Sequence, residues 1–252
     1  MTLQKDCFVT TQTPNSESCH NLPQHIQFRV ILGRADDLKA DVLFQMSVPT
    51  WTETDSPLEL EGFLTGPKST RASTLPVRQN IRIHSQQVVD EGTEILGHST
   101  LTEPAFWTPN APMLYFVKCR ITSSGKEVAL LSQTTGFRRL GVRNHSLWLD
   151  GHRFVLRGAT CSKGNNTSAE QQPAVPEGHR TADIRDLPAE IFTKTNSLEL
   201  EMDENLKTAD EIGQPIIIRL HPKTQPSAIP SLICRLTSHP SVFLTVIPDT
   251  LL

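Results

Sequence analysis

The chain has 252 residues, of which 37% are hydrophobic and 20% charged, and this suffices for one large domain or two modest ones. The formal net charge is -3 and no run of Lys or Arg forms a stripe, so we expect no nucleic-acid partner and no anionic membrane surface as partner. No apolar stretch is long enough to cross a bilayer, and we expect a cytoplasmic protein.

The cysteines are widely spread and include no CxxC pair, which disfavours a zinc site and a disulfide framework. We therefore expect reduced, structural thiols, no metal ion and no cofactor. The five residues are Cys7, Cys19, Cys119, Cys161 and Cys234.

Residues 1–22 are rich in Thr, Ser, Asn and Gln and predict a flexible polar tail. Residues 23–143 contain short β-like runs broken by Pro, Gly and Ser, a pattern typical of an antiparallel sandwich. Residues 52–73 have weak periodicity and are interpreted as a long connection or a frayed edge. The predicted strands include Ile26–Val30, Val42–Met46, Ile81–Ile83, Leu114–Val117 and Val128–Leu131.

Asp150-Gly151 predicts a tight hairpin turn between the short strands Leu147–Leu149 and Arg153–Leu156. Both turn positions of a type I′ hairpin need positive φ angles, which Asp and Gly adopt readily. Residues 161–180 are polar, with Gly, Asn and Pro, and predict a long loop.

From residue 144 onward the pattern changes to strands alternating with helices, which predicts βα units and a parallel sheet. Helices are predicted at Ile184–Thr193, at Glu204–Ile212 with Gly213 as its cap, and at Ser227–Thr237. Strands are predicted at Leu198–Leu200, Ile216–Ile218 and Val242–Ile247.

Three segments, in order and at matching spacing, resemble motifs of glycoside hydrolase family 2, which includes β-galactosidases, β-glucuronidases and β-mannosidases. Residues 103–115 resemble the W-x-P-x-x-P-x-L-Y segment of the family's sandwich domain. Gly136-Phe137-Arg138 resembles the G-F-R that closes that sandwich, and residues 147–159 resemble the hairpin that opens the barrel. We interpret the aromatic side chains Trp107, Tyr115 and Phe137 as core packing rather than sugar platforms.

Later segments resemble the family as well. Ala209-Asp210-Glu211-Ile212-Gly213 is similar to a D-E-L-G segment of the barrel, and His239-Pro240-Ser241-Val242 is similar to the H-P-S-V before its fourth strand. The resemblance implies a multi-domain β and α/β fold. An immunoglobulin-like antiparallel β-sandwich over residues 23–143 would precede a partial (β/α) TIM barrel over residues 144–252.

The resemblance also implies where catalytic groups should lie. Glycoside hydrolysis needs two carboxyl groups, and the family pattern W-S-x-G-N-E puts its acid/base at Thr250, which cannot protonate a glycosidic oxygen at neutral pH. Asp249 is the low-ranked substitute, because neighbouring strand positions point to opposite faces. The family's nucleophile is expected beyond residue 252, and Ser197–Met202 stand where its V-R-x-S-H segment would be. We therefore expect no catalytic residue and no hydrolysis.

The leading interpretation is a non-catalytic, truncated relative that serves as a saccharide-binding or interaction module. The first alternative is a subunit of a split O-glycosyl hydrolase, completed by a second chain that covers the open barrel edge. The second alternative is a scaffold module unrelated to carbohydrate.

Overall fold

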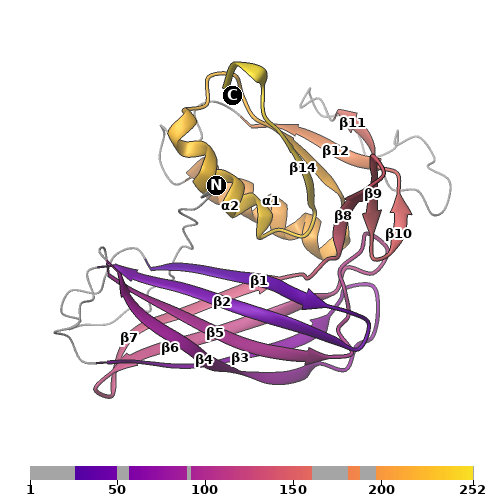
Figure 1. The fold of residues 1–252 in the computed structure, drawn as a ribbon. Coiled ribbons are helices and arrows are strands. Elements are labelled where there is room, and N and C mark those ends of the chain that lie inside the picture. Colours follow the sequence, from indigo (N-terminus) through magenta and orange to yellow (C-terminus); the bar gives the residue numbers. More distant parts are fainter. Residues whose placement is uncertain (1–25, 50–56, 90–91, 161–180, 188–196, 252) are drawn as a thin grey trace.

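The computed structural model describes residues 26–49, 57–89, 92–160, 181–187 and 197–251. The tail predicted over residues 1–22 and the loop predicted over residues 161–180 lie outside these ranges. The described chain forms a curled seven-stranded antiparallel sheet, a small three-stranded sheet, and a four-stranded parallel sheet with two helices (Figure 1). Neither described helix is long and apolar enough to cross a bilayer.

The seven-stranded sheet has the strand order β1-β2-β5-β4-β3-β6-β7, and every neighbouring pair is antiparallel. Strand β4 pairs with β3 through its first half and with β5 through its second half, so the sheet curls into two facing layers (Figure 1). The strands are β1 Gln27–Ala35, β2 Lys39–Pro49, β3 Leu58–Lys68, β4 Val77–Val89, β5 Gly92–Thr102, β6 Leu114–Ser123 and β7 Lys126–Thr135.

The core of the curled sheet follows from strict alternation along its strands, since successive side chains point to opposite faces. On β2 the inward side chains Val42, Phe44 and Met46 are each 0% exposed, and on β6 Val117 and Ile121 are equally buried. The prediction of antiparallel strands before residue 143 is therefore confirmed.

The prediction of a connection or frayed edge over residues 52–73 is wrong for Leu58–Lys68, because these residues form β3 inside the sheet between β4 and β6, and residues 52–56 lie outside the described ranges. Two glycines, Gly62 and Gly66, interrupt the alternation of apolar and polar residues in this strand. A Cβ at Gly62 would lie 2.9 Å from the carbonyl oxygen of Lys118, and one at Gly66 would lie 2.5 Å from the ring of Tyr115. Glycine is needed there because the neighbouring strand approaches closely.

The small sheet follows directly and has the order β10-β9-β8. Its second turn is the predicted Asp150-Gly151 hairpin, with φ angles of 50° and 77°. Its first turn, Asn144-His145, also has two positive φ angles, 48° and 58°. The strands are β8 Leu140–Arg143, β9 Ser146–Leu149 and β10 His152–Phe154.

The parallel sheet has the order β11-β12-β13-β14, and both helices pack on one of its faces. Buried Leu206 of α1 and Leu232 and Leu236 of α2 form one cluster with Ile216 and Ile218 of β13. The elements are β11 Arg157–Thr160, β12 Thr181–Asp186, α1 Ser197–Ile212, β13 Ile216–Arg219, η2 Pro226–Ala228, α2 Ile229–Thr237, β14 Val242–Val246 and η3 Asp249–Leu251.

Two predictions in this part are wrong. Ile184 was expected to begin a helix but lies in β12, where it pairs with Ile217 of β13. Leu198–Leu200 was expected to be a strand but lies in α1. The second parallel strand is Thr181–Asp186 instead.

Candidate functional site

The carboxyl ends of the parallel strands form the candidate site, because helix-flanked parallel sheets carry their ligands there. β12 ends at Asp186 and β13 ends at Arg219, and these two residues are partners in the strand register. The guanidinium of Arg219 donates from Nε to Asp186 Oδ1 at 2.7 Å and from Nη2 to Oδ2 at 2.9 Å. The two strand ends therefore present a bidentate ion pair.

The ion pair is open to solvent, with 46% of the Arg219 side chain and 70% of the Asp186 side chain exposed. Asp186 raises the pKa of Arg219 by accepting its hydrogen bonds, so the guanidinium stays charged. An exposed pair of this kind contributes only about 0–1 kcal/mol to stability. Because both side chains are open to solvent, a polar ligand can reach them.

Sequence reasoning did not find this pair. One signal was present, because Arg219 directly follows the apolar run Ile216–Ile218, and a charge there marks the end of a buried strand. Its partner was hidden, because Asp186 was assigned to a helix.

The residues predicted from the family pattern lie after the fourth strand. Asp249 and Thr250 both belong to the single turn η3 and both are exposed. No hydrogen bond or ion pair recorded for the described residues joins Asp249 to Asp186 or Arg219. After β13, His221 accepts a hydrogen bond at its Nδ1 from the backbone N–H of Lys223 at 3.1 Å.

Within the described ranges, no group of three or more His, Cys, Asp and Glu side chains could hold a metal ion. Arg219 donates hydrogen bonds, and each carboxylate oxygen of Asp186 accepts one of them while keeping a further lone pair. The arrangement can bind hydroxyl or carboxylate groups by hydrogen bonds, but it offers no free carboxyl pair for acid and nucleophile chemistry.

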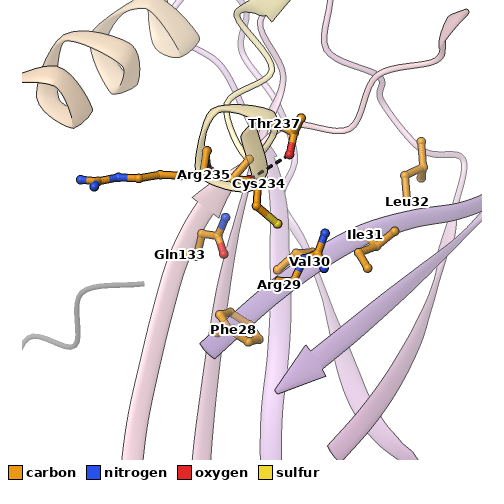
Figure 2. Close-up of a pocket in the computed structure, with 10 residues that line it drawn as sticks. Phe28, Arg29, Val30, Ile31, Leu32, Gln133, Cys234, Arg235 and Thr237 are labelled. Carbon is orange, nitrogen blue, oxygen red and sulfur yellow. Dashed lines mark hydrogen bonds between the residues drawn. The ribbon is translucent and has the colours of Figure 1, made fainter. Parts of the chain in front are cut away.

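A second hollow lies at the seam of the curled sheet, where its edge strands β1 and β7 meet the end of α2 (Figure 2). This pocket has a volume of about 280 Å³, and its lining residues include no carboxylate. Arg235 points away from it in Figure 2 and binds the carboxylate of Asp203 at 3.0 and 2.6 Å. Gln133 contributes a buried amide oxygen without a hydrogen-bond partner.

Cys234 also lines this seam and is disulfide-bonded. The prediction of reduced thiols is therefore wrong at this position. The described residues that line the seam offer the hydroxyls of Thr237 and Ser238 but no carboxyl group.

The motif residues found in the sequence gather instead where the curled sheet meets the parallel sheet. Trp107 is 0% exposed, and its ring lies 6.0 Å from that of Phe243 on β14, which stacks on Phe154 at 5.1 Å. Tyr115 and Phe137 are 2% and 3% exposed, with ring centroids 5.1 Å apart. The prediction that these aromatic residues pack in the core is confirmed.

Arg138 ties the two sheets together from the end of the curled sheet. Its guanidinium donates to the backbone oxygens of Pro240 and Val242, the latter at 2.5 Å from Nη2, and lies 5.1 Å from the Phe243 ring centroid. Burial lowers the pKa of Arg138 to about 10, and the nearby charge of Asp210 opposes this shift.

Residues 25–138 match the family model described as Glycosyl hydrolases family 2. The match covers the curled sheet and ends at Arg138. Among curated proteins, none matches the chain.

Solved structures share the fold. A calcium-binding mutant of Bacteroides uniformis β-glucuronidase 2 is 15% identical with a TM-score of 0.56, over 88% of this chain and 28% of that one. A glycosyl hydrolase family 2 member from Bacteroides cellulosilyticus is 16% identical with a TM-score of 0.52, over 87% of this chain and 30% of that one.

A putative β-galactosidase from Bacteroides fragilis is 16% identical with a TM-score of 0.51, over 86% of this chain and 33% of that one. The chain thus spans a third or less of the length of these structures. At such identities the likeness shows the fold alone.

Proposed function

We propose that this chain, whose residues 25–138 carry a domain of glycosyl hydrolases family 2, is a carbohydrate-related module that does not hydrolyse glycosides by itself. It would combine an immunoglobulin-like sandwich with the first four strands of a TIM barrel. The parallel order β11-β12-β13-β14, with both helices on one face, supports the barrel assignment, because consecutive barrel strands are neighbours in space.

The proposal that hydrolysis is absent rests on which carboxylates lie at the ends of the parallel strands. Among the described residues that follow or end the four strands, these are Asp186, whose charge is paired with Arg219, and Asp249, which is exposed. Retaining hydrolysis needs two carboxyl groups about 5 Å apart, one of them protonated. Thr250, at the position that the family pattern gives to the acid, has no dissociable proton at neutral pH.

The test is turnover of aryl β-galactosides, β-glucuronides and β-mannosides by the purified chain. We expect no product above the buffer rate. The variants are Asp249→Ala and, as a matched control, Asp37→Ala, which removes an aspartate that is 84% exposed near the β1–β2 turn. Turnover that Asp249→Ala abolishes and Asp37→Ala keeps would make Asp249 a catalytic residue and overturn the proposal.

Saccharide binding without turnover is the activity that the Asp186–Arg219 pair supports, since both groups can hydrogen-bond sugar hydroxyls. Ligand-observed NMR with the same glycosides measures it. We expect weak binding that Arg219→Met reduces. No binding of any glycoside would favour a scaffold role instead.

A second candidate function is that of a subunit completed by another polypeptide. β14 is an outer strand of the parallel sheet, and its side chains Leu244 and Val246 are 40% and 44% exposed. An open parallel edge with exposed apolar side chains is a surface that proteins usually cover. Because the similar structures are about three times as long, the partner would carry further β/α units.

This candidate is tested by mixing the chain with a polypeptide that holds the later strands of a family barrel. Hydrolysis that appears only in the mixture, and that Leu244→Glu abolishes, would favour it. Hydrolysis in neither sample would favour the non-catalytic module.

A further inference from the structure

The carboxyl end of α1 requires hydrogen-bond donors for its last backbone carbonyl oxygens, and these donors come from outside the helix. The last turn of any helix leaves backbone carbonyl oxygens without intrahelical partners, and it carries a partial negative charge. α1 has no basic residue in its last turn. Its own cap includes the bond from the N–H of Gln214 to the carbonyl oxygen of Ala209 at 2.9 Å, across Gly213 at a φ of 71°.

The next three carbonyl oxygens of α1 are each bound by a side chain of the curled-sheet part. Trp107 Nε1 donates to Asp210 at 2.8 Å, and Thr70 Oγ1 donates to Glu211 at 2.7 Å. The guanidinium of Arg71 donates to Ile212 through Nη2, which also brings a positive charge to the negative end of the helix.

Close packing reinforces this contact. A Cβ at Gly213 would lie only 2.4 Å from the carbonyl oxygen of Pro109, so the loop that carries Trp107 presses directly on the helix cap. The side chain of Asp210 continues the contact inward. It binds His239 Nδ1 at 2.7 Å and accepts the backbone N–H of Ser241 at 2.9 Å, just before β14.

We propose that the curled-sheet part serves as the external C-cap of α1, so that α1 and the parallel sheet it covers are stable only while docked on it. The donors come from residues 103 to 141 positions away in sequence, so α1 cannot obtain them locally. This device does not depend on any saccharide function of the chain.

Hydrogen-exchange mass spectrometry of the full chain tests the proposal. Trp107→Phe keeps a large aromatic ring and removes the Nε1 donor. We expect exchange in peptides of α1 to rise about tenfold, while peptides of β2 and β5 keep their protection. The matched control is Trp148→Phe, because Trp148 Nε1 donates to Arg143 within the exposed β8–β9 hairpin at 3.3 Å. This control should leave exchange in α1 unchanged.

Arg71→Met and Thr70→Val provide surface variants that spare the core. Each should raise exchange in α1 alone, and the double variant should raise it further. If Trp107→Phe unfolds the entire chain, hydrogen exchange in α1 of the Arg71→Met and Thr70→Val variants tests the proposal instead. Unchanged exchange in α1 in the double variant, or an equal rise in α1, β2 and β5, would overturn the proposal.

Discussion

Cys119 shows at the level of one residue how the curled sheet controls chemistry. Its side chain on β6 is 0% exposed, and burial raises the pKa of the thiol from 9.0 to about 12. The thiolate is the reactive form of cysteine, so the folded protein holds this residue in its inert form.

We therefore predict that iodoacetamide at about pH 8 does not modify Cys119 in the folded chain and modifies it fully in denaturant. Peptide mass spectrometry reads the result site by site. Because the unfolded thiol ionises above pH 9.0 while the folded thiol does not, stability should also fall as pH rises from 9.0 to about 12. Labelling of native Cys119 at the denatured rate would contradict the assigned burial.

At the level of elements, the hairpin β9–β10 was predicted correctly because its signal is local. Asp150-Gly151 needs only its own two φ angles to define the turn. Strand β3 was missed for the opposite reason. Its glycines Gly62 and Gly66 look like breaks in the sequence, but they are dictated by β6, whose sequence lies more than 40 residues away.

The errors around β12 and α1 have a similar cause. Ile184 and Leu187 are three residues apart, which mimics one face of a helix, and Leu198 and Leu200 alternate as in a strand. Short patterns of this kind are ambiguous until tertiary contacts decide them. The pair Asp186–Arg219 was out of reach for the same reason, because it exists only once β12 and β13 are aligned.

Gly151→Val should destabilise the chain by about 1–2 kcal/mol, because a β-branched residue resists the φ of 77° at this position. A Cβ at Gly151 would touch nothing within 4 Å, so the effect is one of backbone conformation alone. Gly141→Val in β8 is the control, since a Cβ there is equally free and the φ is ordinary. Urea unfolding compares the two variants. Equal midpoints would argue against the turn.

For the whole molecule, the main question is how two cores hold together. Between the core of the curled sheet and the core under the helices lies a third cluster, which contains Trp107, Leu114, Leu149 and Phe243. Each of the three sheets contributes a residue to this cluster, and the guanidinium of Arg138 lies over the ring of Phe243. The motifs that suggested a family from the sequence thus describe a junction between two units rather than a catalytic site.

Arg138→Met should destabilise the chain by about 2–4 kcal/mol, because it leaves two buried carbonyl oxygens without a donor and Asp210 without a nearby positive charge. Urea unfolding followed by circular dichroism measures the change. Arg120→Met, which breaks an exposed pair with Glu127 at 3.2 Å, is the control and should cost less than about 0.5 kcal/mol. Equal effects would show that the junction contributes no more than the surface.

The external cap of α1 also has a consequence for the order of events during synthesis. The ribosome releases Thr70, Arg71 and Trp107 long before α1, which begins at Ser197. A domain that emerges first generally folds first. The curled sheet can therefore be folded, with its donors in place, when α1 leaves the exit tunnel. The nascent helix can then dock directly on a preformed surface.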